Sequence, residues 1–502
     1  MSVARLGSKT LARDFTASLV VFLVAMPLCM GIAIASGVPP EKGLITGIIG
    51  GIVVGLLAGS PLQVSGPAAG LAVIVFEIVQ KQGIAALVPI LLIAGALQFG
   101  AGVMRLGGWF RVISPSVVHG MLAGIGVLIV VGQFHVLFDD RPLPSGLENL
   151  AAMPAQLLGL SPRTIASAEM AFLVGMITIG SMLAWEKFRP ASLRLVPGAL
   201  VGVLAGTLAA WAGGLDVVRV DVPQSLVASI VLPTPGSFMD SVTSAVIVSA
   251  IAIAFIASAE TLLSAAAVDR MHDGVRTDYN KELRAQGVGN MLCGAAGALP
   301  MTGVIVRSSA NVQAGALTRT SAVLHGVWIL GFVALLPWLL REIPMASLAG
   351  ILVVTGVRLV SLKHVRHLFS SYGPLPAVIW AVTLVMIVAT DLLTGVLVGI
   401  ALSMVEVIPY MRRLRLNLTQ REEAGAYNID LDGTATFVSL PKLSEALEEA
   451  PVDRKVRLNF ERLAKIDHTC AELVSDWLQR RRGRGVETEL VGTANHRGMR
   501  HT

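Results

Sequence analysis

Two short segments, about half the chain apart, combine small polar residues with the start of a small-residue helix. The first runs from Val64 to Ala68 and the second from Val306 to Ala310. We expect each to be a short strand entering a half-helix, whose free N–H groups and positive dipole end attract an anion. Paired interruptions in the two halves of a membrane protein point to a transporter binding site. The simpler alternative is a helix kink or a packing seam of small residues. The candidate binding residues are Ser65, Gly66, Pro67 and Ala68 in the first segment, and Arg307, Ser308 and Ser309 in the second.

Arg307 is the most informative single residue. A charge at membrane depth costs several kcal/mol and usually marks a pathway or a pairing partner. Between two helix N-termini this side chain would add to a positive field, which is poor for a structural ion pair and good for holding an anion. The alternative is that Arg307 lies near a helix end and extends its head to the membrane surface.

Carboxylates supply the candidates for ion coupling. Glu260 is the only carboxylate well inside its apolar run. It is expected to carry a proton or to serve as the counter-ion of Arg307, and the plainer alternative is a side chain facing a cytoplasmic vestibule. Glu41 and Glu77 sit near expected span ends, where we expect them to be solvated, and Glu41 is kept as a second coupling candidate.

Two prolines lie where a helix would begin or break. Pro67 suits the first turn of a helix, where no N–H is needed. Pro27 lies inside the first apolar run, where it is expected to break the helix and free a carbonyl. Such a break would open a wall of the binding cavity, so Pro27 is a further binding candidate, against the alternative of a simple kink.

Composition places the chain in a membrane. Of its 502 residues, 54% are hydrophobic and only 14% are charged, whereas soluble domains carry about 25% charged residues. The net charge of +6 therefore reports orientation rather than a nucleic-acid partner. The three cysteines are scattered and form neither a disulfide framework nor a metal-binding spacing. We expect no cofactor, no metal and no enzymatic activity.

The apolar runs predict an all-α polytopic membrane protein with about fourteen spans. They fall near residues 15–37, 41–58, 67–81, 84–104, 115–135, 165–186, 192–213, 241–264, 284–299, 307–317, 320–340, 346–360, 374–390 and 392–410. Amphipathic stretches at Gly107–Ile113 and Ser361–Ser371 are expected in the interface. Lys and Arg are concentrated in the loops assigned to the cytoplasm, which predicts that both termini lie on the cytoplasmic side of the membrane.

The two halves are expected to form a seven-plus-seven inverted repeat. Seven is odd, so the second half must sit upside down relative to the first. Aligning Ser65 with Arg307 gives an offset of 307 − 65 = 242 residues. The expected boundaries are a cytoplasmic N-terminus at 1–14, repeat one at 15–213, repeat two at 241–415 and a small cytoplasmic α/β domain at 420–502.

This C-terminal domain is charged and alternates in hydropathy. Strands are expected at Tyr427–Leu431, Val456–Phe460 and Val486–Val491, with amphipathic helices at Leu443–Glu449 and Ala471–Arg482. Asp467 lies between the second strand and the second helix. It is expected to cap that helix, and the alternative is a ligand or partner site.

These motifs together resemble the sulfate permease (SulP) family, which includes bacterial anion transporters and the animal proteins prestin and pendrin. The resemblance rests on Ala25-Met26-Pro27 to Gly43-Leu44, on Val64–Ala68 and on Arg307-Ser308-Ser309, and it covers nearly the whole chain. It implies core and gate domains, a central anion site between the third and tenth helices, a homodimer and a STAS-like tail. The tail is short, and Asp467-His468-Thr469 replaces the phosphorylatable Asp-Ser of bacterial anti-sigma-antagonist relatives, which argues against that regulation.

We therefore expect a secondary active transporter of small anions, of the sulfate, bicarbonate or dicarboxylate class. Protons or sodium are the expected coupling ions, and proton symport by alternating access is the favoured mode. A nucleobase–cation symporter of the same architecture is the nearest rival function. Those proteins differ from this chain in having a carboxylate or amide where it has Arg307. A membrane-anchored sensor that signals through the tail comes next, and an anion channel is third.

Overall fold

The structure is a computed structural model. It describes residues 8–108, 114–158, 165–223, 242–272, 274–361, 365–366, 369–370, 374–407, 416–423, 426–436, 439–451, 454–483 and 487–492. The chain divides into two compact units. One holds residues 1–107, 125–360 and 388–392, and the other holds residues 108–124, 361–387 and 393–502.

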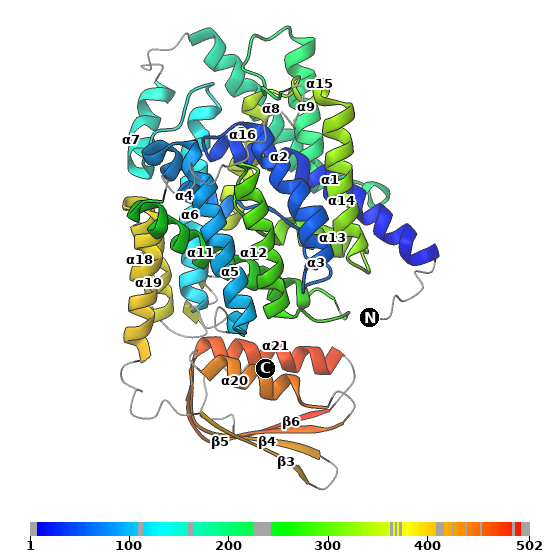
Figure 1. Ribbon diagram of the computed structural model, residues 1–502, viewed down its shortest axis with the longest axis vertical. Coiled ribbons are helices and arrows are strands. Elements are labelled where there is room, and N and C mark those ends of the chain that lie inside the picture. The colour runs from blue at the N-terminus through cyan, green and yellow to red at the C-terminus, as the bar shows by residue number, and fades with distance from the viewer. Residues whose placement is uncertain are drawn as a thin grey trace. The chain divides into compact units, whose positions relative to one another are not determined.

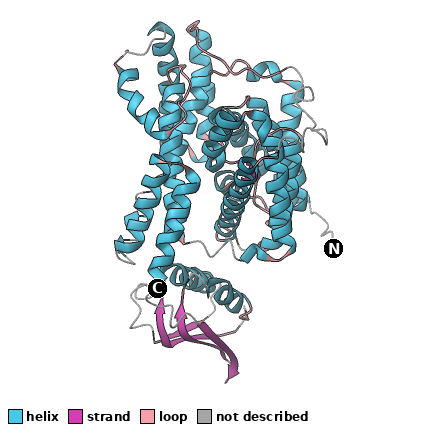
Figure 2. Ribbon diagram, turned by 60° about the vertical axis from the view of Figure 1, so that its left-hand side comes forward, coloured by secondary structure: helices cyan, strands magenta, loops and turns pink. Residues whose placement is uncertain are grey.

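Helices dominate the first four hundred residues (Figures 1 and 2). Those of the first half are α1 Ser8–Ala35, α2 Pro40–Ile49, α3 Gly55–Leu57, α4 Ala69–Gln82, α5 Leu87–Val103, α6 Pro115–Val136, α7 Gly146–Leu157, α8 Ile165–Phe188 and α9 Gly198–Ala212. Those of the second half are α11 Ser244–Asp269, α12 Tyr279–Ala295, α13 Ile305–Gln313, α14 Thr320–Leu335, α15 Pro337–Leu340, α16 Met345–Leu359, α18 Pro374–Ala389 and α19 Leu392–Val407.

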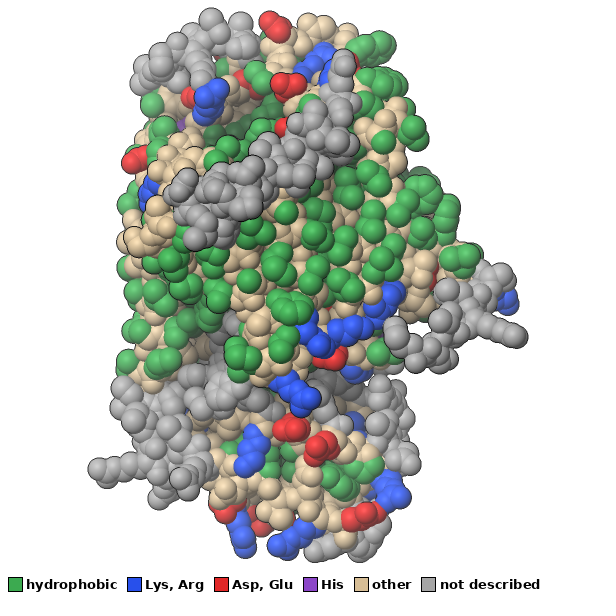
Figure 3. Space-filling view, in the orientation of Figure 1, with side chains coloured by type: hydrophobic (Ala, Val, Ile, Leu, Met, Phe, Trp, Pro, Cys, Tyr) green, Lys and Arg blue, Asp and Glu red, His purple; other side chains and the backbone are tan. Residues whose placement is uncertain are grey.

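The helices agree with the apolar runs of the sequence. In the described part of the chain, six helices are long and apolar enough to cross a membrane, and five more are apolar but shorter. Figure 3 shows hydrophobic side chains over much of the visible surface of this helical part, where a soluble protein would be polar. The all-α polytopic fold class is confirmed.

The structure corrects the prediction for Pro27 and adds a helix that was not expected. Pro27 does not interrupt the first span, because α1 continues through it to Ala35; membrane helices tolerate proline where local adjustments and neighbours satisfy the freed carbonyl. Helix α7 is absent from the expected elements. Its start carries Ser145, whose hydroxyl accepts from the Glu148 N–H at 3.2 Å, and this spacing of serine and glutamate is a capping signal that predicts a helix start.

Two three-residue strands interrupt the helices, each directly before a half-helix. Strand β1, Ser65–Pro67, pairs antiparallel with β2, Met301–Gly303. Ser65 lies opposite Gly303, and Pro67 lies opposite Met301. All six residues are buried. Because the strands run in opposite directions, the helices that follow them, α4 and α13, leave the pair at opposite ends, as an inverted repeat requires.

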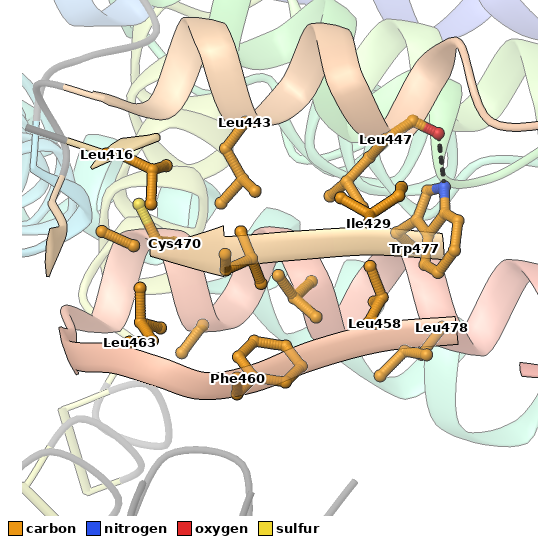
Figure 4. Packing of buried hydrophobic residues seen from close by; sticks show 14 of the residues in the cluster. Leu416, Ile429, Leu443, Leu447, Leu458, Phe460, Leu463, Cys470, Trp477 and Leu478 are labelled. Carbon is orange, nitrogen blue, oxygen red and sulfur yellow. Dashed lines mark hydrogen bonds between the residues drawn. The ribbon is translucent and has the colours of Figure 1, made fainter. Parts of the chain in front are cut away.

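The C-terminal domain is a four-stranded sheet with helices α20, Leu440–Glu448, and α21, His468–Gly483, on one face (Figures 1 and 2). The strands, in the order β3-β4-β5-β6, are Leu416–Glu423, Ala426–Ala435, Val456–Ile466 and Thr488–Val491. Strand β3 is an addition to the expected strands, because its sequence is mostly polar, as suits an edge strand. Figure 4 shows the core of this domain, where Leu458 and Phe460 meet α21 and the Trp477 indole donates to the Leu447 carbonyl at 2.8 Å. Asp467 caps α21 by accepting from the Cys470 N–H at 2.8 Å.

Some expectations lie wholly or partly outside the described residues. These are the N-terminal residues 1–7, most of the two interfacial stretches (109–113, 362–364, 367–368 and 371), the segment 224–241 and the end of the tail after residue 492.

Candidate functional site

The strand pair brings the two halves of the expected site together. Helix α4 begins at Ala69, directly after β1 and the extended Ala68, and α13 begins at Ile305, directly after β2 and the extended Val304. The first-turn N–H groups of each helix have no intrahelical acceptor. Each helix also brings about half a unit of positive charge to the pair. Two positive helix ends therefore converge on one short sheet.

The register between the halves differs from the expected one. The second strand is Met301–Gly303, and Val306–Ala310 is already helical. Matching the helix starts gives an offset of 305 − 69 = 236 residues rather than 242. The strand before α13 lies at 301–303 and not within 306–310, so the alignment of Ser65 with Arg307 is wrong by six residues. Pro67 likewise belongs to the strand and not to the first helical turn.

Arg307 lies in the first turn of α13 and is completely buried. A Cβ built on Gly66 would come within 3.2 Å of its Cζ atom and closer still to Nη1, so the guanidinium fills the space that this glycine leaves open. Within the described residues, none of its three guanidinium nitrogens has a nitrogen or oxygen hydrogen-bond partner, and the Cys29 thiol is a polar side chain beside them.

Among the described residues, two titratable side chains lie near enough to Arg307 to interact electrostatically with it. They are the Cys29 thiol, in α1, and the His325 imidazole, in α14. A thiol is only a weak acceptor of hydrogen bonds, and a protonated imidazole would repel the guanidinium. Neither group therefore neutralises the charge of the arginine.

The serines beside Arg307 differ in their roles. The Ser308 hydroxyl accepts from the Val64 N–H at 2.9 Å and donates to the Val304 carbonyl at 2.7 Å, so it ties α13 to the segment before β1. The Ser309 hydroxyl donates to the Val306 carbonyl at 3.0 Å. Both hydroxyls are thus engaged in this structure.

Glu260 lies beside the other half-helix. A Cβ on Gly70 would come within 2.7 and 2.9 Å of its two carboxylate oxygens, so the carboxylate packs against the first turn of α4. Its Oε2 atom is buried and accepts no hydrogen bond from any residue that the structure describes. No ion pair joins Glu260 to Arg307 in the described part of the chain, since the guanidinium nitrogens are without partners. The counter-ion interpretation therefore has no support here.

The two remaining candidates do not meet the strand pair through any hydrogen bond in the described residues. Glu41 lies in the first turn of α2 and is buried, which corrects the expectation that it is solvated. Its charged neighbours are Lys42 and Asp221. Pro27 is buried within α1.

Sequence reasoning missed a polar stripe on α12. Glu282, Gln286 and Asn290 follow one another at intervals of four residues and are all completely buried. Gln286 donates to the Ser65 hydroxyl at 2.7 Å and to Glu282 at 3.0 Å. Asn290 accepts from the Met301 N–H at 2.8 Å. The four-residue spacing is the signal that could find this stripe, but Glu282 precedes the apolar run at 284–299 and so falls outside the expected span.

Glu282 orients the first strand through this stripe. Its Oε2 accepts from the N–H groups of Gly59 and Ser60, at 2.8 and 2.9 Å. Its Oε1 accepts from Gln286, so the amide must present its NH₂ group to both Glu282 and Ser65. Ser65 consequently accepts from Gln286, and its own hydroxyl proton is left for another acceptor.

The described residues contain no group of three or more His, Cys, Asp or Glu side chains that could hold a metal ion. The polar groups around the strand pair are instead suited to a small charged solute. Arg307 and two helix N-termini supply positive charge, and Ser65 supplies a hydroxyl donor. These groups can bind a solute through opposite charge and through hydrogen bonds.

Residues 11–383 match the family model described as the sulfate permease family. The chain is 31% identical over 452 residues to the Bacillus subtilis (strain 168) protein named "Putative sulfate transporter YvdB", covering 87% of this chain and 82% of the relative. It is 25% identical over 438 residues to the bicarbonate transporter BicA of Picosynechococcus, covering 84% of this chain and 74% of BicA.

Two solved structures have the same fold. The transmembrane domain of a cyanobacterial BicA superposes with a TM-score of 0.67 at 23% identity, covering 77% of this chain and 98% of that one. SLC26A9 superposes with a TM-score of 0.68 at 16% identity, covering 96% of this chain and 84% of that one. The second match therefore takes in both the helical part of the chain and the C-terminal domain.

Proposed function

The chain belongs to the sulfate permease family, and we propose that it is a secondary active transporter that binds a small anion between β1, β2 and the half-helices α4 and α13. The substrate class is sulfate, bicarbonate or a small dicarboxylate. Transport is a symport with protons or sodium by alternating access. The protein works as a homodimer in the bacterial cytoplasmic membrane, with both termini in the cytoplasm.

The observation that carries this proposal is the state of Arg307. Its guanidinium is completely buried and has no nitrogen or oxygen hydrogen-bond partner among the described residues. It also stands in the first turn of a helix, where the dipole disfavours a cation. Burial, missing partners and position each raise the free energy of the charge. A bound anion would relieve all three, because it supplies opposite charge and accepts the free N–H groups.

Glu260 supplies the means of coupling. Its carboxylate packs against the first turn of α4, so in the ionised form it occupies part of the positive field that the anion needs. Two negative charges near one helix end repel each other. A proton or a sodium ion on Glu260 would remove this repulsion and favour anion binding. By linkage, the anion would favour binding of the ion by the same factor.

Ser65 completes the proposed site as a donor. Gln286, held by Glu282, fills an acceptor position of the Ser65 hydroxyl. The free hydroxyl proton then has a bound anion oxygen as its acceptor. Gly66 permits the close approach of Arg307 to β1, and Pro67 and Ala68 lead the chain into α4 with no side chain large enough to fill the site.

The test is uptake of radiolabelled sulfate, bicarbonate and succinate, each in turn, into proteoliposomes containing the purified protein. The other two anions and uracil serve as unlabelled competitors, and inward proton and sodium gradients are imposed separately. We expect concentrative uptake of one of these anions under one of the gradients. Absence of flux in all combinations would favour a sensor. Flux that never exceeds equilibrium would indicate a channel, and competition by uracil but not by anions would indicate a nucleobase carrier.

A further inference from the structure

Thr261, the residue after Glu260, is bonded to both strands of the site. Its hydroxyl accepts from the Gly303 N–H at 3.1 Å, in β2. Its carbonyl accepts from the Gln63 side-chain amide at 2.9 Å, two residues before β1. Thr261 and Gln63 are buried. A Cβ on Gly303 would overlap the Gln63 amide, so the three residues are packed without free space.

A second route joins the same turn of α11 to β2. The Ser258 hydroxyl accepts from Gln98 at 3.2 Å. Gln98 accepts from Asn290 at 2.7 Å, and Asn290 accepts from the Met301 N–H at 2.8 Å. The turn that carries Glu260 is therefore tied to the strand pair at both of its ends, at Ser258 and at Thr261. Glu260 itself packs on α4, the helix that follows β1.

We propose that Thr261 is a positioning residue that couples the ion at Glu260 to the anion between the strands. The proposal rests on the proposed function, since it needs an ion-responsive Glu260 and an anion at the strand pair. Neutralising Glu260 removes its repulsion from the anion at the α4 terminus. The change in the position of α11 that follows moves Gly303 and Gln63, because Thr261 is hydrogen-bonded to both. Thr261 does not contact the anion. It makes α11 and the two strands move together, so that binding of the ion at Glu260 changes the affinity for the anion.

The experiment measures the anion dissociation constant with and without the coupling ion, on the full-length protein in detergent. Sulfate, which stays a dianion, is titrated at acidic and alkaline pH, and sulfate, bicarbonate and succinate are each titrated at alkaline pH with and without sodium. The ratio of dissociation constants is the coupling factor. For the wild type we expect a ratio on the order of tenfold, as is typical of linked sites. Thr261→Val, which removes the hydroxyl contact with Gly303 and leaves the carbonyl contact with Gln63, should lower the ratio, whereas Thr261→Ser, which keeps the hydroxyl acceptor, should preserve it.

Two further variants separate coupling from folding. Gln63→Met removes only the second contact of Thr261 and should lower the ratio partially, which tests the proposal if Thr261→Val does not fold. Thr383→Val is the matched control. Its hydroxyl, also completely buried, donates to the Ile379 carbonyl of its own helix at 2.7 Å, and this variant should keep the wild-type ratio. A change in both dissociation constants without a change in their ratio would mean that Thr261 only supports the fold, and would overturn the proposal.

Glu260→Gln separates failure of the Thr261 route from failure of the coupling site itself. If this variant abolishes the ratio while Thr261→Val and Gln63→Met keep it, the coupling role of Thr261 is wrong and that of Glu260 stands. If Glu260→Gln keeps the ratio, or if the wild type shows none with any of the three anions, coupling at Glu260 fails and the inference fails with it.

Discussion

At the scale of single residues, the site consists of polar groups that the fold leaves unsatisfied. Buried polar atoms are normally hydrogen-bonded. Yet three guanidinium nitrogens of Arg307 and one carboxylate oxygen of Glu260 have no nitrogen or oxygen hydrogen-bond partner among the residues that the structure describes. Natural proteins retain such groups where function requires them, at a cost in stability. Substitution of these residues should therefore affect stability and transport in opposite directions.

Arg307→Met is expected to abolish concentrative uptake while leaving the melting temperature unchanged or higher. The methionine removes a buried, unpaired charge and fills much of the same space. Loss of charge-assisted hydrogen bonds worth about 1.5–3 kcal/mol should weaken anion binding by roughly ten- to a hundredfold. Titration calorimetry and thermal unfolding of the same preparation measure both effects. Arg358→Ala, which removes an exposed ion pair with Glu186, is the control. Wild-type affinity in Arg307→Met would refute the assigned role.

Glu260→Gln is expected to remove the dependence of uptake on a proton gradient, because an amide cannot release a proton. Exchange of internal for external anion should survive, since the neutral amide resembles the protonated carboxyl group. Counterflow and gradient-driven uptake, measured side by side in proteoliposomes, separate the two activities. Concentrative uptake by the variant under an inward proton gradient would show that another group carries the proton. If sodium alone drives the wild type, Glu260 belongs to a cation site instead.

At the scale of elements, two glycines in the segment from β1 to α4 set how closely the charged side chains of Arg307 and Glu260 approach its backbone. Gly66 lies against Arg307 and Gly70 lies against Glu260, each so closely that a methyl group would collide. Small residues here allow the charges to lie directly against the backbone of β1 and α4.

Gly66→Ala should displace the guanidinium and lower anion affinity while sparing the ion response. Gly70→Ala should displace the carboxylate and lower the coupling factor more than the affinity. The matched controls are Gly100→Ala and Gly180→Ala, helical glycines where an added Cβ meets nothing within 4 Å. These should bind and transport like the wild type. Equal effects of Gly66→Ala and Gly70→Ala on both quantities would contradict the separate roles proposed for Arg307 and Glu260.

At the scale of the whole molecule, the C-terminal domain has its own hydrophobic core. Strands β4 and β5 and helices α20 and α21 bury residues such as Ile429, Leu458 and Val474 against one another. Burial also raises the pKa of the Cys470 thiol well above its ordinary value. The proposed binding residues all belong to the other unit of the chain.

A chain ending at Arg415 should therefore still insert into the membrane and bind the anion with wild-type affinity. Its transport rate or its dimer stability should fall if the tail braces two protomers. Binding by calorimetry, initial uptake rates and the mass of the detergent-solubilised particle test these separately. A truncated protein that is monodisperse and folded, yet binds no anion, would contradict this division of roles.

Several features of this protein were determined by its sequence alone. Long apolar runs permit only helices in a lipid environment, so the helical spans and the polytopic fold followed directly. Small residues at 65–68 and the arginine at 307 indicated an anion site, because few arrangements tolerate a charge at membrane depth. The alternating hydropathy of the tail predicted its central strands and both helices.

Only the tertiary structure decided how these residues meet. The pairing of β1 with β2 joins residues more than two hundred positions apart, which no local pattern contains, and it replaced the expected register. The polar stripe of α12 and the double contact of Thr261 acquire meaning only when α11 and α12 are packed against the strands. That Arg307 is unpaired, and that Glu260 packs on α4 rather than on Arg307, are properties of packing, because burial and partners belong to the folded chain and not to its residue types.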